Sequence, residues 1–359
     1  MRLPCTRAWG DYETELNGGG VWCEPGAVLS NCIVGGCVAD QDGGGAFRGT
    51  LYDCTLVGNA CGDDGAGACE SVLWRCLLRE NDTEDQGGGL YQGSATACRL
   101  LDNTSLDHGG GAIFATLRDC VVAGNSANYT GGGTALCTNR NCTIVGNTAL
   151  GGGGVYGGTM TNCIVWGNAG VHGANWEENG FDEPPAHCCT TPQPTGTGHV
   201  TVSPSFTDMD NGDYRLTAGS PCIDAGTNAA VTMAADLDGN PRIVFGTVDM
   251  GAYEYVSSTS DYDGDGLSND EEGIAGTDVT DPDSRLAFIS ILATGATELV
   301  WIGGTQTRQF VEMKTDLAST TEQWVVIHTN EPPTPITNAL ALPGAPAPTR
   351  FYRIRVEGQ

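Results

Sequence analysis

Residues 131–147 read Gly-Gly-Gly-Thr-Ala-Leu-Cys-Thr-Asn-Arg-Asn-Cys-Thr-Ile-Val-Gly-Asn, and this order of glycine, cysteine and asparagine recurs along the chain. The column cysteines recur every 22 residues, with a last step of 21: Cys32, Cys54, Cys76, Cys98, Cys120, Cys142 and Cys163. The column asparagines follow five residues later in all repeats but the first: Asn59, Asn81, Asn103, Asn125, Asn147 and Asn168. Glycine clusters keep the same step, so the chain repeats one structural unit.

Each repeat has a local period of two around its column cysteine. The position two residues later is always aliphatic: Val34, Leu56, Leu78, Leu100, Val122, Ile144 and Val165. The residue between is mixed in character, for example Thr55 or Arg99. This alternation predicts a short strand whose cysteine and aliphatic side chains point inward. A second apolar column, which includes Leu51 and Leu73, lies three residues before the cysteine, and its odd spacing predicts a bend between two strands.

Short strands separated by bends cannot bury a face alone, so successive repeats are expected to stack as coils of a solenoid. A leucine-rich repeat is disfavoured, because the repeats lack a Leu-x-x-Leu-x-Leu frame. In the stack, the column asparagines are expected at a turn, with left-handed backbone and amides bonded to the coils above and below. The glycines are expected to supply positive φ or close backbone approach at another turn.

Two groups of segments resemble known families. Residues 142–147 and the Gly-Gly-Gly-Val-Tyr segment 152–156 resemble bacterial right-handed β-helix repeats, and are similar to those of polymorphic outer membrane proteins. Residues 220–226, 236–242 and 248–255 are similar to the choice-of-anchor Q domain, which follows or caps such helices in exported bacterial proteins. The resemblances imply an all-β, right-handed parallel β-helix (a pectin lyase-like solenoid) over residues 1–186 and terminal coils with a cap over 187–256. They also imply an extracellular, cell-surface or outer-membrane location.

Residues 261–272 read Asp-Tyr-Asp-Gly-Asp-Gly-Leu-Ser-Asn-Asp-Glu-Glu, the pattern of a 12-residue calcium loop. The expected ligands are Asp261, Asp263, Asp265, the Leu267 carbonyl, Asn269 and Glu272. Together with the acidic residues that follow, this segment resembles a thrombospondin type 3 repeat. We therefore expect a calcium-binding linker over residues 257–284; the alternative is a solvated acidic linker.

Charge and cysteine content limit the partners and the compartment. The 44 acidic and 16 basic residues give a net charge of −28, which disfavours nucleic acid. Sixteen cysteines favour an oxidising compartment. The sequence has no run of 18 apolar residues, so no transmembrane segment is expected, and no signal peptide is visible, which suggests that the sequence begins inside a larger protein.

Two columns of side chains are candidate ligand-binding strips. Asp63, Asp85 and Asp107 share one position of the repeat, where stacked carboxylates could hold a cation or sugar hydroxyls, or form a solvated turn. Trp22, Phe47, Tyr91 and Tyr156 share another, which is predicted to point outward. These aromatic rings could bind sugar rings or pack on neighbouring side chains.

The spacing of the cysteines separates two groups. In-register parallel neighbours hold their Cβ atoms about 4.8 Å apart, longer than the ~3.8 Å of a disulfide, so the column cysteines are predicted to be buried free thiols. The better disulfide candidates lie off the column: Cys5, Cys23, Cys37, Cys61, Cys69 and Cys137.

Residues 285–359 alternate polar and apolar residues between proline-rich loops, which predicts a small C-terminal β-sandwich.

The sequence predicts two classes of function. The favoured function is a noncatalytic extracellular scaffold or adhesin, which presents the β-helix face to carbohydrate or to a host or cell-surface protein. The alternative is a polysaccharide lyase or glycoside hydrolase, with Arg79, Arg99 and Arg118 as basic residues near the acid column.

Overall fold

The computed structural model divides into two compact units, Met1–Tyr255 and Val256–Gln359. It describes residues 2–3, 16–24, 26–179, 183–244, 246–257, 259, 263, 265–275, 277, 283–284, 286–293, 297–303, 308–316, 323–332, 337–342 and 350–357.

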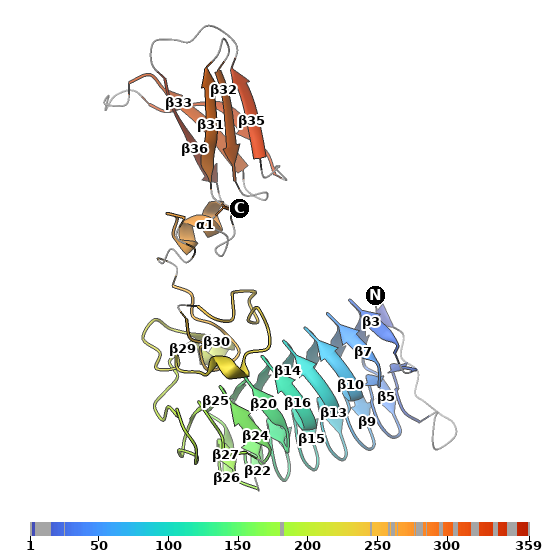
Figure 1. The fold of residues 1–359 in the computed structure, drawn as a ribbon. Coiled ribbons are helices and arrows are strands. Elements are labelled where there is room, and N and C mark those ends of the chain that lie inside the picture. The colour runs from blue at the N-terminus through green and yellow to red at the C-terminus, as the bar shows by residue number, and fades with distance from the viewer. Residues whose placement is uncertain are drawn as a thin grey trace. The chain divides into compact units, whose positions relative to one another are not determined.

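Unit 1 is a parallel β-solenoid with three sheets that run along its length (Figure 1). Sheet A contains β1 (Arg2–Leu3), β4 (Ile33–Gly35), β8 (Thr55–Val57), β11 (Leu77–Arg79), β14 (Arg99–Leu101), β17 (Val121–Ala123), β21 (Thr143–Val145), β25 (Ile164–Trp166) and β28 (Cys189–Thr190). Sheet B contains β2 (Val21–Trp22), β3 (Val28–Ser30), β6 (Ala46–Phe47), β7 (Thr50–Tyr52), β10 (Ala68–Trp74), β13 (Leu90–Thr96), β16 (Ala112–Arg118), β19 (Thr134–Ala135), β20 (Thr138–Arg140), β23 (Val155–Tyr156), β24 (Thr159–Thr161) and β27 (Trp176–Glu177). Sheet C contains β5 (Val38–Ala39), β9 (Ala60–Cys61), β12 (Asp82–Thr83), β15 (Thr104–Ser105), β18 (Ser126–Ala127), β22 (Thr148–Gly151) and β26 (Ala169–His172).

The register of the sheets follows the sequence repeat. In sheet A, Leu77 pairs with Thr55 on one side and Arg99 on the other, each 22 residues away. Ile164 pairs with Cys189, which extends the stack by one coil beyond the seven that the column cysteines predict. The predicted parallel stacking of coils is therefore confirmed.

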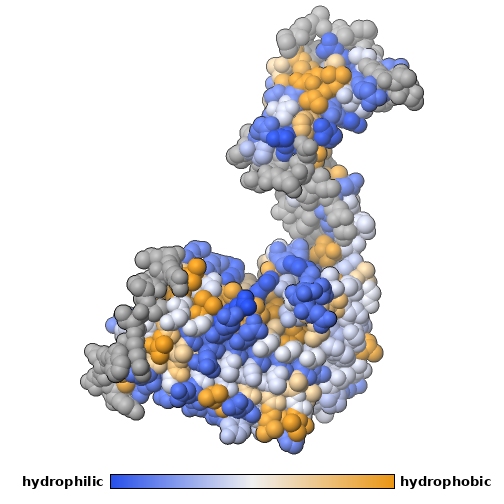
Figure 2. Space-filling model, turned by 180° about the vertical axis from the view of Figure 1, so that it is seen from behind, coloured by the Kyte–Doolittle hydropathy of each residue, from blue (hydrophilic) through white to orange (hydrophobic). Residues whose placement is uncertain are grey.

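The interior of the solenoid is apolar, as predicted. The column cysteines and the aliphatic residues two positions later are buried in one continuous cluster, which Cys188 of the added coil joins. The second apolar column lies in the same cluster, with Leu51 and Leu73 fully buried. On the face drawn in Figure 2, apolar side chains occur in small groups among polar ones.

The column asparagines form a buried ladder. Asn103 shows the pattern: its Nδ2 donates to Asn125 Oδ1 at 2.9 Å and to Leu78 O at 3.0 Å, while its Oδ1 accepts from Asn81 Nδ2 at 2.8 Å. The prediction of left-handed backbone at these asparagines is wrong, because positive φ falls on the preceding residue, for example 55° at Asp102. The corner residue before each column cysteine is also left-handed, for example Ala97 with φ 51°.

The glycines fulfil both predicted roles. Gly43 has φ +67°, and a Cβ on Gly44 would lie 2.3 Å from the carbonyl oxygen of Ala60. A side chain at Gly44 would therefore push adjacent coils apart at this turn.

The cap, residues 204–255, packs on the outer face of sheet A. It contains β29 (Phe206–Asp208), η1 (Met209–Asn211), β30 (Asp213–Leu216) and η2 (Asn228–Ala230) joined by loops. Ala252 and Tyr253 contact the outward side chains of β17 and β21, while Leu216, Cys222 and Met250 cover Ile164 and Cys189. The cap thus covers the C-terminal coils of this face.

Buried charges join the cap to the coils. Arg242 Nε donates to Asp119 Oδ1 at 3.0 Å, and its Nη1 and Nη2 donate to Glu254 and to the Gly251 carbonyl. The three charged side chains are at most 6% exposed. The segments 236–242 and 248–255 therefore supply the buried charges of this contact.

Unit 2 contains helix α1 (Asn269–Ala275) and two antiparallel three-stranded sheets. One sheet has the order β31 (Ala287–Ala293), β32 (Thr297–Ile302), β35 (Thr337–Leu342), and the other has the order β34 (Val325–Asn330), β33 (Arg308–Lys314), β36 (Phe351–Glu357). Leu299, Trp301 and Val311 form the core that the two sheets share, so the predicted β-sandwich is confirmed. Within the described ranges, no helix is both long and apolar enough to cross a membrane.

Candidate functional site

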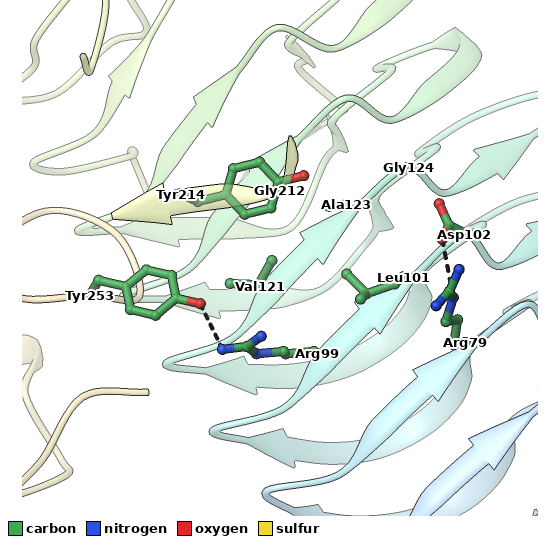
Figure 3. A pocket seen from close by; sticks show the side chains of 10 residues that line it. All are labelled: Arg79, Arg99, Leu101, Asp102, Val121, Ala123, Gly124, Gly212, Tyr214 and Tyr253. Atoms are coloured by element: carbon green, nitrogen blue, oxygen red, sulfur yellow. Dashed lines mark hydrogen bonds and ion pairs between the residues drawn. The ribbon is translucent and has the colours of Figure 1, made fainter. Parts of the chain in front are cut away.

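A hollow of about 280 Å³ lies between the outer face of sheet A and the cap (Figure 3). Three successive coils supply its floor and one wall through β11, β14 and β17 and the corners that follow, and the cap supplies the opposite wall. The lining residues are Arg79, Arg99, Leu101, Asp102, Val121, Ala123, Gly124, Gly212, Tyr214 and Tyr253. They project into the hollow because alternate residues of a strand point away from the core.

Two arginines give the hollow its positive charge. Arg79 Nη2 lies 3.0 Å from Glu80 Oε1 and its Nε lies 3.5 Å from Asp102 Oδ2, so these carboxylates partly neutralise its charge. Arg99 instead donates from Nη2 to the hydroxyl of Tyr253 at 3.1 Å (Figure 3). Among the described residues, Arg99 has no carboxylate at ion-pair distance, and its exposed guanidinium can therefore pair with an anion from solvent.

The tyrosines add hydroxyl groups above an apolar floor. Burial raises the pKa of both Tyr214 and Tyr253, so both phenols stay protonated at neutral pH. The Tyr253 hydroxyl accepts from Arg99 and can still donate its proton. The floor is formed by Leu101, Val121 and Ala123.

These groups suit a ligand that has an anionic group, hydroxyls and an apolar ring face. A guanidinium binds a carboxylate or sulfate with two parallel hydrogen bonds. Of the described lining residues, Asp102 alone carries a carboxyl group, and Arg79 lies beside it. A glycoside hydrolase usually needs two carboxyl groups that flank the scissile bond.

The predicted acid column lies elsewhere, at the turn between sheets C and B. Asp107 Oδ1 is 3.2 Å from His108 Nε2, and burial, with a hydrogen bond to Asp85, raises the pKa of Asp107. Asp63 is exposed, and its carbonyl accepts from the Thr83 hydroxyl. The basic residues predicted near this column lie on other sheets, Arg79 and Arg99 on A and Arg118 on B.

The predicted outward column of aromatics is only partly exposed. Trp22 is 39% exposed and Tyr91 is half-buried, but Phe47 is 5% exposed, which fits the expected alternative that these rings pack on neighbouring side chains. The reason is local: the Arg48 guanidinium lies 4.7 Å from the Phe47 ring centroid, and Phe114 packs edge-on against Tyr91 at 6.0 Å. Arg48 and Phe114, which both have left-handed backbone in sheet B, therefore cover part of the aromatic column.

None of the seven residues of the acid and aromatic columns lines the hollow on sheet A. The repeat pattern showed that Arg99 lies at an outward position, but it contained no sign that Tyr253, 154 residues later, lies beside it. The available signal was the one-residue alternation in sheet A, which marks Arg79, Arg99 and Leu101 as outward.

The candidate calcium loop brings three carboxylates together in unit 2. Ligand atoms of Asp263, Asp265 and Glu272 lie within 4.8 Å of one another. Asp263 Oδ2, Asp265 Oδ2 and Asn269 Oδ1 are buried and have no hydrogen-bond partner among the described residues. The Leu267 amide donates to Asp265 Oδ1 at 2.7 Å. Asp261, the first predicted ligand, lies outside the described residues.

The spacing predicts the free column thiols correctly, but its prediction of disulfides at the off-column cysteines is wrong for four of the five that the structure describes. The column thiols are buried and free, and Cys37 is disulfide-bonded. The other off-column candidates in the described part of the chain are free thiols: Cys23, Cys61, Cys69 and Cys137. Cys5 lies outside the described residues.

The chain has no match among protein-family models, curated proteins or solved structures. The geometry of the hollow and of the acidic loop is therefore the basis for the function proposed below.

Proposed function

We propose that this protein is a noncatalytic extracellular scaffold that binds an anionic saccharide in the hollow between sheet A and the cap. The observation that carries the proposal is Arg99, a guanidinium with no described carboxylate partner in a chain of net charge −28. Around it stand two tyrosine hydroxyls and an apolar floor, the groups that recognise a uronic acid ring.

The solenoid supports this role by its rigidity. Arg79 and Arg99 are fixed on neighbouring strands by ladder hydrogen bonds, and Tyr253 is fixed by the cap that Arg242 anchors. Binding therefore needs little ordering of the protein. The rows of sheet A that the cap leaves uncovered continue from the hollow toward the N-terminal coils, which suits a chain of sugars rather than one ring.

Calorimetric titration of the full chain with oligogalacturonate tests the proposal, with a neutral galactan oligomer as the comparison ligand. Arg99→Gln is expected to weaken oligogalacturonate binding by about 10-fold or more, because it removes a charged hydrogen bond. Arg48→Gln is the matched control, since Arg48 is exposed and paired with Glu70 at 2.8 Å on another sheet.

Equal binding by the two variants, or no binding of oligogalacturonate by the wild-type chain, would refute the saccharide site. Chromatography of the oligomer after incubation tests the alternative function. Shortened or unsaturated products would replace the noncatalytic scaffold by a polysaccharide-cleaving enzyme.

We also propose that the acidic loop of unit 2 binds calcium. The support is the set of buried oxygen atoms at Asp263, Asp265 and Asn269, because buried carboxylate and amide oxygens without donors suit a hard cation. Titration of the full chain with calcium chloride is expected to release or absorb heat, which Asp265→Asn removes and the exposed Glu298→Gln preserves. Absence of heat at millimolar calcium would refute this site.

A further inference from the structure

Two buried thiols meet where the cap covers the last coil. Cys189 begins β28, and Cys222 lies in a turn of the cap; both are fully buried in one apolar cluster with Leu216 and Met250. The Cys189 thiol donates to the Val202 carbonyl at 3.4 Å, and the Cys222 side chain packs in the same cluster. This is a contact between the solenoid and a segment outside its repeat.

The backbone around Cys222 differs from that around the column thiols. Strand pairing holds column neighbours about 4.8 Å apart, so bringing two of their Cβ atoms to ~3.8 Å would break the ladder. Cys222 instead lies in a turn outside the strands: its amide donates to Ser220 Oγ at 3.2 Å, and its carbonyl accepts from the Met250 amide at 3.0 Å. It can approach Cys189 without disturbing the register of the coils.

We propose that Cys189 and Cys222 form a disulfide that fastens the cap to the last coil. The disulfide at Cys37 is an independent sign that the chain folds where thiols are oxidised. A small disulfide such as glutathione disulfide is the oxidant. Its S–S bond breaks and the Cys189–Cys222 bond forms, the two protein sulfurs are oxidised, and two glutathione thiols leave with the two protons.

The bond forms before the cap is fully docked. Contact with Cys222, together with burial, raises the pKa of Cys189, so the folded protein holds very little of the thiolate that attacks a disulfide. While the cap is undocked, Cys189 lacks the contact with Cys222 and the burial that raise its pKa. Refolding in a glutathione redox buffer therefore oxidises the pair faster than adding the same buffer to folded, reduced protein.

Peptide mapping tests the proposal on the wild-type chain. The protein is refolded in the redox buffer, denatured in iodoacetamide without reductant, and digested. The expected result is a cross-linked peptide containing Cys189 and Cys222, while Cys69 is alkylated. Alkylation of both Cys189 and Cys222 without prior reduction would overturn the proposal.

Thermal unfolding gives a second, independent measurement. Reductant is expected to lower the Tm of the oxidised wild-type chain and of Cys69→Ala equally, because Cys69 is a buried free thiol away from the cap. Cys222→Ala is expected to lose less on reduction, since only the disulfide of Cys37 remains to be broken. An equal drop in all three proteins would overturn the proposal.

Discussion

The coils of unit 1 bury thiols, aliphatic side chains and amides that recur in every turn, whereas the cap buries charges that occur once. In the coils, each asparagine bonds to equivalent groups one coil away, so the stabilising contacts are spread evenly along the solenoid. In the cap, Arg242 alone joins Asp119 of a coil corner to Glu254.

This difference shows where stability is distributed and where it is concentrated. A repeated ladder contributes many similar nearest-neighbour terms. A single buried polar network depends on each member, because removing one leaves the others buried without their partner. The hollow that contains Arg99 lies between these two regions, with one wall from the coils and the opposite wall from the cap.

The largest expected effect comes from removing the charge at the cap. Arg242→Met leaves Asp119 and Glu254 buried without a cation, and is expected to lower the free energy of unfolding by about 3–5 kcal/mol. The matched control is Arg215→Met, whose exposed pair with Asp238 is expected to contribute only about 0–1 kcal/mol. Urea unfolding followed by tryptophan fluorescence measures both variants. Equal losses of unfolding free energy would show that the buried charges of the cap contribute no more than an exposed ion pair.

The ladder is expected to respond less, and equally at each coil. Asn103→Ala leaves the Leu78 carbonyl and the Asn81 amide group without their buried partners, and is expected to cost about 2–3 kcal/mol. Asn81→Ala should cost the same within about 0.5 kcal/mol, because both asparagines make equivalent bonds. Clearly unequal losses in urea unfolding would contradict an evenly distributed ladder.

The repeat explains why the coils could be predicted from sequence and the cap contacts could not. Column cysteines such as Cys98, the inward aliphatics and the asparagine ladder were all predicted, because stacking makes each position its own neighbour. The position of left-handed backbone was not, since Asn103 uses its side chain in the ladder and Asp102 takes the corner.

In the candidate site, too, the coil residues could be predicted from the repeat and the cap residues could not. The outward position of Arg99 follows from its place in the repeat, but the Arg99–Tyr253 contact joins residues from a coil and from a loop without periodicity. For Phe47 the sequence left exposure and packing both open, and the structure favours packing because Arg48, at a left-handed position of sheet B, covers the ring. In unit 2, the spacing alone grouped Asp263, Asp265 and Glu272, because all three belong to one short loop.

The pH dependence of stability should distinguish the buried carboxyl groups around the cap from the asparagine ladder of the coils. Burial raises the pKa of Asp119 and Asp249 to about 6 and that of Glu254 to about 9. A raised folded-state pKa means that the folded protein binds protons more tightly, so stability is greatest below pH 4 for these groups. It falls as pH rises through 6 for the two aspartates and through 9 for Glu254.

The expected loss between pH 5 and pH 7 is about 1 kcal/mol for each of the two aspartates. Urea midpoints measured across this range give the slope, and Asp119→Asn should make it shallower. The asparagine ladder does not titrate, so Asn103→Ala should lower stability without changing the slope. Stability that rises from pH 5 to pH 7 would contradict the raised pKa values of Asp119 and Asp249.

The smallest expected effect concerns two alanines of one coil, two residues apart. Ala97 occupies a left-handed corner with φ 51°, where an L-residue costs about 1–2 kcal/mol, so Ala97→Gly is expected to stabilise the chain by about 0.5–1 kcal/mol. Ala95 is fully buried in β13, and Ala95→Gly is expected to destabilise by about 1 kcal/mol, because it loosens a strand and opens a cavity. Urea unfolding at one pH measures both. Changes of the same sign would show that backbone strain at the corner does not limit the stability of the coils. The asparagine ladder alone would then set that stability.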